Sequence, residues 1–139
     1  MGAGPPDRIR RAVERALSDP TRPVGVTGAR AVGGGCISPT ARLETDAGSY
    51  FLKWGGPDLP PELLGAEARG LQELADAGEV RVPAVVARSA SGDPPWLLLE
   101  WLEPGSGGPG AWRRLGAELA ALHRHGDDRF GADADNFIG

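Results

Sequence analysis

The spacing of apolar side chains along the chain predicts three helices. In residues 7–18 the apolar positions recur at helical intervals, which gives one apolar face and an arginine-rich outer face. A second helical pattern runs from residue 62 to 77 and stops at Gly78, a typical helix-ending residue. The third follows Trp112, Leu115, Leu119 and Leu122 and ends at Gly126.

Runs of another kind, short and rich in β-branched or apolar residues, predict strands. They cover residues 24–32, 40–45, 50–52, 80–88 and 96–102. A turn signal, Asp46-Ala47-Gly48-Ser49, joins the second run to the third. Pro83 makes the fourth run either an edge strand or an entry segment. The last run, WLLLEWL, is apolar enough for a buried strand, and the glycine- and proline-rich segment 103–110 after it is the best candidate for a domain boundary.

Composition narrows the class of protein. A chain of 139 residues makes one domain, or a small domain and an incomplete second one. The net charge of −4 offers no broad basic surface for nucleic acid, and no stretch has the length and apolarity of a membrane span. The single cysteine excludes an internal disulfide and is compatible with a reducing cytosol, so we expect a cytoplasmic protein.

A glycine-rich loop supplies the first candidate chemistry. It reads Gly33, Gly34, Gly35, Cys36, Ile37, Ser38, and the third predicted strand ends on Lys53. Glycines let backbone N–H groups approach phosphate oxygens, and a lysine on a neighbouring strand adds a positive charge. A Walker A loop or a dinucleotide fingerprint would need a helix next, and here strands follow. The protein-kinase pattern remains, with a plain flexible loop and a solvated lysine as its alternative.

Glu67 is the second candidate. It falls on the apolar stripe of the helix predicted over residues 62–77, three positions after Leu64 and four before Leu71. A carboxylate on a packed face is costly unless a partner satisfies it. We therefore predict that Glu67 pairs with Lys53, as a helix glutamate holds the strand lysine in kinases, unless Glu67 instead reaches water at the edge of the stripe.

Taken together, these segments resemble the fructosamine (ketosamine) kinase family, whose fold is shared with aminoglycoside phosphotransferases and, more distantly, protein kinases. The resemblance runs from about residue 9 to the end, through GGGCIS, YFLKW, AEARGL, LLLEWLE, LGAELAALHRH, FG and DNFIG. It implies an α+β fold, with an antiparallel sheet of about five strands and a packed helix in residues 1–102. Residues 103–110 would link this lobe to the first helix of a helical lobe in residues 111–139.

The resemblance also implies an activity and a site. The family uses ATP and Mg2+ to phosphorylate the 3-hydroxyl of ketosamines, which are glycation adducts, and so frees the amine. Gly33 to Ser38 would cover the phosphates, and Lys53, held by Glu67, would contact them. The adenine would meet the backbone of the hinge and a few apolar side chains: Glu100, Trp101, Leu102, Leu99, Ala41 and Phe51.

Cys36 corresponds to a position where members of this family carry a redox-sensitive cysteine. A thiol among exposed N–H groups and near Lys53 favours its thiolate. Redox control through an intermolecular disulfide, and hence a redox-dependent dimer, is one expectation. An inert small residue that fits the loop is the other.

The chain departs from the kinase pattern in its second part. The catalytic aspartate followed five residues later by a magnesium-binding asparagine, and the second metal-binding aspartate, are absent. Asp128-Arg129-Phe130-Gly131 imitates the metal-binding triplet without the preceding loop, and Asp133 and Asp135 lack the spacing to Asn136. We expect the metal ligands beyond residue 139, and ATP and a ketosamine as partners. An aminoglycoside-type phosphotransferase and a non-catalytic nucleotide-binding module remain alternatives.

Overall fold

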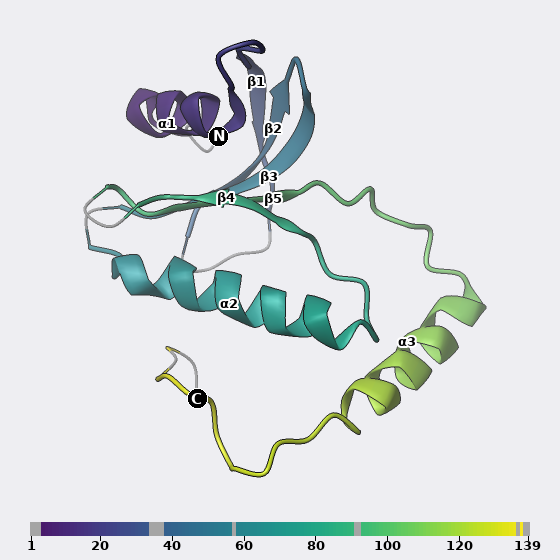
Figure 1. Ribbon diagram of the computed structural model, residues 1–139. Coiled ribbons are helices and arrows are strands. Elements are labelled where there is room, and N and C mark those ends of the chain that lie inside the picture. Colours follow the sequence, from purple (N-terminus) through teal and green to yellow (C-terminus); the bar gives the residue numbers. More distant parts are fainter. Residues whose placement is uncertain (1–3, 34–37, 57, 91–92, 136, 138–139) are drawn as a thin grey trace.

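The computed structural model describes residues 4–33, 38–56, 58–90, 93–135 and 137. The fold is α+β, as predicted, and the described residues form five antiparallel strands in the order β1-β2-β3-β5-β4 and three helices (Figure 1). In chain order the elements are α1 (Asp7–Leu17), β1 (Val26–Ala31), β2 (Thr40–Thr45), β3 (Gly48–Trp54), α2 (Pro61–Ala77), β4 (Val85–Arg88), β5 (Trp96–Glu100) and α3 (Pro109–Leu122).

Three strands are shorter than the sequence predicts. The first was expected over residues 24–32 and spans Val26–Ala31. The fourth was expected over residues 80–88 but pairs only from Val85, because Pro83 has no N–H to donate to a ladder. The fifth ends at Glu100 instead of residue 102, where the chain leaves the sheet. The third is longer than expected, because the tight turn lets β3 pair with β2 from Gly48 onward.

Helices cover both faces of the sheet: α1 lies on one side and α2 on the other (Figure 1). Ile9 and Val13 of α1 pack on Leu43, Leu52 and Leu98 in one core, and Leu64 and Ala68 of α2 pack on Leu97 and Leu99 in the other. Successive strand residues point to opposite faces. The continuous apolar run of β5 is therefore buried throughout, because each face has its own helix.

The helix α2 ends where the sequence predicts. Gly78 adopts the left-handed conformation, with φ of 71°, and its N–H donates to the Leu74 carbonyl at 3.3 Å. Glycine adopts this conformation readily because it has no Cβ to crowd the backbone. Gly78 therefore fixes the end of the helix that carries Glu67.

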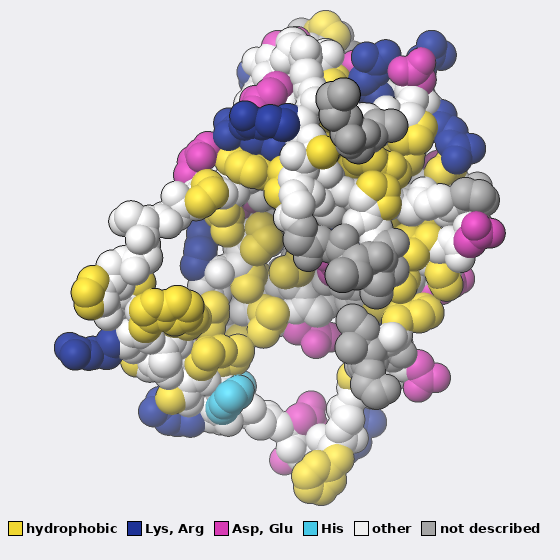
Figure 2. Space-filling model, turned by 180° about the vertical axis from the view of Figure 1, so that it is seen from behind, with side chains coloured by type: hydrophobic (Ala, Val, Ile, Leu, Met, Phe, Trp, Pro, Cys, Tyr) yellow, Lys and Arg dark blue, Asp and Glu magenta, His cyan; other side chains and the backbone are white. Residues whose placement is uncertain are grey.

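The third helix stands apart from the sheet, at the end of an extended segment that leaves β5 (Figure 1). None of its residues is buried, and Trp112, Leu115 and Leu119 are exposed. Hydrophobic side chains gather over this helix on the face seen in Figure 2. It begins at Pro109, so the last two residues of the predicted linker belong to the helix. None of the helices described is long and apolar enough to cross a lipid bilayer.

Candidate functional site

The ion pair predicted between Lys53 and Glu67 is present. Lys53 Nζ lies 2.6 Å from Glu67 Oε2, joining β3 to α2 across the sheet face that α2 covers. The two side chains are 21% and 32% exposed, so the pair is neither fully solvated nor sealed in the core. Lys53 is also the only lysine in the sequence. Glu67 is the hydrogen-bond partner of this ammonium group among the described residues, which leaves two of its three N–H donors for a ligand.

An apolar hollow of about 210 Å³ lies along the same strand. Its lining residues are Phe51, Pro83, Leu99, Glu100, Trp101 and Leu102. Phe51 pairs with Leu99 in the register of β3 and β5, and it lies two positions before Lys53, on the same sheet face. Five of the six lining residues belong to the predicted adenine site. The prediction missed Pro83, whose only signal was its place before the fourth strand.

Backbone groups beside this hollow are free to bind a ligand. Within the described residues, the N–H and C=O groups of Trp101 and Leu102 form no hydrogen bond. The Glu100 carboxylate, in contrast, is already engaged: it accepts from Arg81 Nη2 at 2.6 Å and from the Ala84 N–H at 3.2 Å. The Ala84 N–H, followed by Arg81, lowers the pKa of Glu100 below its usual value. The side chain of Glu100 therefore braces the strand end, and the backbone after it carries the free donors and acceptors.

Ala41 does not lie beside this hollow. It is 1% exposed in the core on the α1 side, opposite Leu52, whereas Phe51 faces α2. The expectation that Ala41 and Phe51 lie together over the base is therefore wrong for Ala41. The residue of β2 that shares the sheet face of Phe51 is one position later, because neighbouring residues of a strand face opposite sides. The register partner of Phe51 on β2 is Arg42, a residue without a predicted role.

The glycine loop is only partly described. Residues 34–37 lie outside the described ranges, so the predicted roles of Gly34, Gly35, Cys36 and Ile37 stay predictions. Ser38, where the description resumes, is 4% exposed, and its Oγ has no hydrogen-bond partner among the described residues. A buried hydroxyl without a partner is costly in a folded protein.

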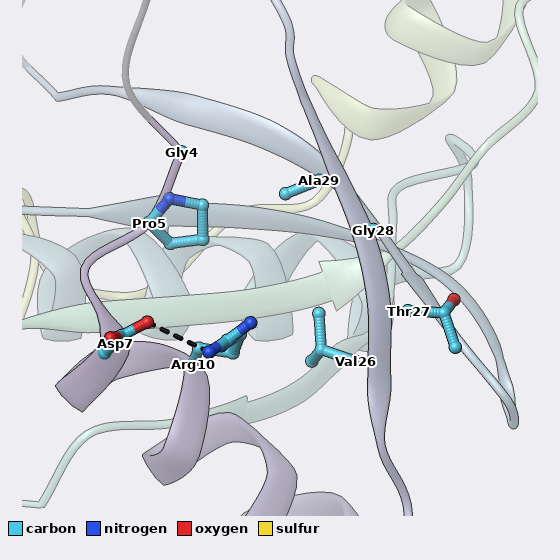
Figure 3. Close-up of a pocket in the computed structure, with 8 residues that line it drawn as sticks. All are labelled: Gly4, Pro5, Asp7, Arg10, Val26, Thr27, Gly28 and Ala29. Atoms are coloured by element: carbon cyan, nitrogen blue, oxygen red, sulfur yellow. Dashed lines mark hydrogen bonds and ion pairs between the residues drawn. The ribbon is translucent and has the colours of Figure 1, made fainter.

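A second hollow, of about 200 Å³, lies between the N-terminal segment and β1 (Figure 3). The Asp7–Arg10 ion pair, 3.0 Å long, stands at one side of it. No predicted site residue lines this hollow. In the part of the chain that the structure describes, no three His, Cys, Asp or Glu side chains are placed to hold a metal ion.

A five-stranded antiparallel sheet whose strand lysine is held by a helix glutamate, beside an apolar hollow, is typical of the N-terminal lobe of protein-kinase-like folds. The family profile described as fructosamine kinase matches residues 9–139. The chain belongs to the fructosamine kinase family.

Individual relatives agree with this assignment. A probable ketoamine kinase of Synechocystis is 35% identical over 131 residues, covering 93% of this chain and 44% of that protein. A chloroplastic protein-ribulosamine 3-kinase of Oryza sativa subsp. indica is 34% identical over 119 residues, covering 82% of this chain and 34% of that protein. A candidate fructosamine-3-kinase of Haemophilus somnus superposes with a TM-score of 0.78 at 21% identity, covering 96% of this chain and 44% of that one, and shows the shared fold. The chain thus spans less than half the length of these relatives.

Proposed function

We propose that this chain binds ATP and forms the nucleotide-binding part of a kinase that phosphorylates the 3-hydroxyl of ketosamines. The observation that carries the proposal is the Lys53–Glu67 ion pair, two residues along β3 from an apolar hollow that ends in free backbone groups. The names of the relatives, ketoamine kinase and ribulosamine 3-kinase, supply the substrate class.

The residues present fit an adenine nucleotide. The apolar walls of the hollow, Phe51 and Leu99, suit the faces of a purine, and the unpaired backbone groups of Trp101 and Leu102 suit its hydrogen-bonding edge. Lys53 would then meet the phosphates, oriented by Glu67, and the buried Ser38 hydroxyl is a further donor at the loop. This arrangement separates an apolar end for the base from a cationic end for the phosphates.

Magnesium, when bound with ATP, neutralises charge on the transferring phosphoryl group. The motif that would hold it and orient the attacking hydroxyl is absent from these 139 residues. The part of the site that this chain supplies therefore binds and orients the nucleotide. We expect the 139-residue chain to bind adenine nucleotide weakly and to transfer no phosphate by itself.

A labelling experiment tests the nucleotide site directly. An acyl-phosphate derivative of ATP transfers its acyl group to a lysine beside the phosphates, and the only lysine here is Lys53. We expect mass spectrometry to find Lys53 acylated and free ATP to suppress the reaction, with Lys53→Arg as the unlabelled control. Labelling that ATP does not suppress would contradict a nucleotide site at Lys53.

The activity needs its own assay. ATP-dependent phosphorylation of a ribose- or fructose-derived ketoamine is measured for this chain, for a version extended to the length of the relatives, and for the Synechocystis relative. We expect turnover by the extended version and none by the 139-residue chain, with the Synechocystis relative as the reference for the assay. Robust turnover by the 139-residue chain would overturn the placement of the missing catalytic groups. Nucleotide binding without turnover by the extended version would favour a non-catalytic nucleotide-binding module.

A further inference from the structure

Arg42 is the centre of a side-chain network that no predicted role explains. Its side chain is 22% exposed and points from β2 to the same sheet face as Phe51. Its Nη2 donates to Ser49 Oγ at 3.1 Å, and its Nε lies 2.6 Å from Glu44 Oε1, an ion pair without hydrogen-bond alignment. Ser49 Oγ in turn donates to Glu44 Oε2 at 2.6 Å. This hydrogen bond, followed by the charge of Arg42, lowers the pKa of Glu44, so the carboxylate stays ionised beside the guanidinium.

The other side of the guanidinium contacts the segment that leaves the sheet after β5. Arg42 Cζ lies 4.7 Å from the centroid of the Trp101 ring, within the range of a cation–π contact. Arg42 Nη1 lies 3.5 Å from Glu103 Oε1, and the same carboxylate oxygen accepts the Trp101 Nε1–H at 2.9 Å. The guanidinium, the indole and the carboxylate therefore form a closed triangle.

This triangle matters because, among the described residues, Trp101 makes no other hydrogen bond. Among the described residues its backbone makes no hydrogen bond, and its indole N–H bonds only to Glu103, which is itself on the same free segment. Arg42 is therefore the link in this network between that segment and the sheet. Trp101 and Leu102 form one wall of the apolar hollow, which Arg42 does not line.

We propose that Arg42 is a positioning residue: by stacking on Trp101 and pairing with Glu103, it holds the wall of the hollow in place and so controls the affinity for the adenine base. This inference rests on the proposed function for its ligand and on geometry alone for its mechanism. Arg42 acts from outside the hollow, which it does not line. Its planar guanidinium can stack on a ring and pair with two carboxylates at once. A lysine at this position would keep the charge and lose the planar contact.

The order of the Trp101 side chain is the first readout. The chain has four tryptophans, so nitrogen-15 relaxation of the four indole N–H groups separates them. Trp54 and Trp96 are buried and report an ordered ring, whereas Trp112 is 74% exposed and reports a mobile one. We expect Trp101 to be as ordered as Trp54 in the native chain and to approach Trp112 in Arg42→Met, with Arg42→Lys between them.

The matched control is Arg30→Met. Arg30 lies opposite Arg42 in the β1–β2 register, is exposed, and its replacement removes the same charge. Glu103→Gln is the second test variant; the side chain it changes is 71% exposed, so the fold should tolerate the loss. We expect Arg30→Met to leave Trp101 ordered and Glu103→Gln to loosen it.

Affinity for ADP, followed by chemical-shift titration, is the second readout. We expect ADP to bind about tenfold more weakly to Arg42→Met than to the native chain, and equally to Arg30→Met. A Trp101 ring that stays ordered without Arg42 overturns the proposal, as does a mobile ring with unchanged ADP affinity. If the native chain binds no ADP, the proposed function fails, and the order of Trp101 alone then decides whether Arg42 positions the wall.

Discussion

Breaking the Lys53–Glu67 ion pair should destabilise the fold by an amount between the values for surface and buried pairs. Exposed pairs contribute roughly 0.2–1 kcal/mol, and removing one partner of a buried pair costs about 3–5 kcal/mol. Here the atoms are 2.6 Å apart and the side chains 21% and 32% exposed, so solvent screens part of the attraction. We expect a coupling free energy of about 1–2 kcal/mol.

The single substitutions should be unequal. Glu67→Gln keeps a hydrogen-bond acceptor for the ammonium, so its cost should be about 1 kcal/mol. Lys53→Met leaves the Glu67 carboxylate unpaired next to Leu64 and Ala68, which are buried, so its cost should be about 2 kcal/mol. The double variant should lose less than the sum of the two.

Urea unfolding followed by tryptophan fluorescence measures all four free energies of unfolding, because Trp54 and Trp96 lie in the core. The Arg114–Glu118 pair on α3, 3.7 Å apart with the arginine 74% exposed, is the control and should couple by about 0.3–0.5 kcal/mol at most. A Lys53–Glu67 coupling no larger than this control would show that the pair does not stabilise the fold. Raising the salt concentration should reduce both coupling free energies, and it should reduce that of the more exposed Arg114–Glu118 pair by the larger fraction.

Three further predictions concern the fold around the site. Gly55→Ala should cost about 1–3 kcal/mol, because a Cβ there would lie 2.7 Å from Leu59 Cβ and 2.9 Å from Pro95 Cγ, whereas Gly56→Ala, with nothing within 4 Å, should be tolerated; thermal unfolding of the pair decides. Glu100 has a lowered pKa in the fold, so it stabilises the fold above its usual value of 4.5 and loses this effect as the pH falls through the folded pKa. Glu100→Gln should therefore destabilise the chain near pH 7 and progressively less in acid, and an equal loss at every pH would contradict the assignment. Sedimentation should show concentration-dependent association of this chain through its exposed α3 face, reduced by Trp112→Arg; unchanged association would move the contact elsewhere.

The ion pair was predicted from local patterns in the sequence together with the kinase arrangement of a strand lysine held by a helix glutamate. A glutamate on an apolar helical stripe and a lysine at the end of an apolar strand each signalled a charge that needs a partner. Because the helix follows the strand after a short loop and packs on the sheet, the two charges had few other ways to be satisfied. The bounds of α1 and α2 were predicted to within one residue for similar reasons, since periodicity and a terminal residue are both encoded locally. The third helix was predicted to end at Gly126, but it ends at Leu122.

The error at Ala41, which was expected to lie beside Phe51, shows that local patterns must be combined with the register between strands. The turn pairs Thr45 with Gly48. Counting back along β2 and forward along β3 from this pair places Arg42 opposite Phe51 and Ala41 opposite Leu52. The alternation of Ala41 and Leu43 with charged residues carried the same information. Strand periodicity assigns residues to two faces, and only the register says which face a partner strand shares.

The network of Arg42, Trp101 and Glu103 lay beyond such reasoning for a different physical reason. Arg42 reads as an ordinary outward charge on a strand, Glu103 as part of a polar linker, and no spacing connects residues so far apart in the chain. Their contact depends on β5 lying next to β3, which in turn lies next to β2, and on the direction in which the chain leaves the sheet. If Arg42 does hold that segment, a side chain of β2 positions the wall that follows β5, although β3 lies between these two strands. The shape of the hollow would then depend on the pairing of the whole sheet rather than on the residues that line it.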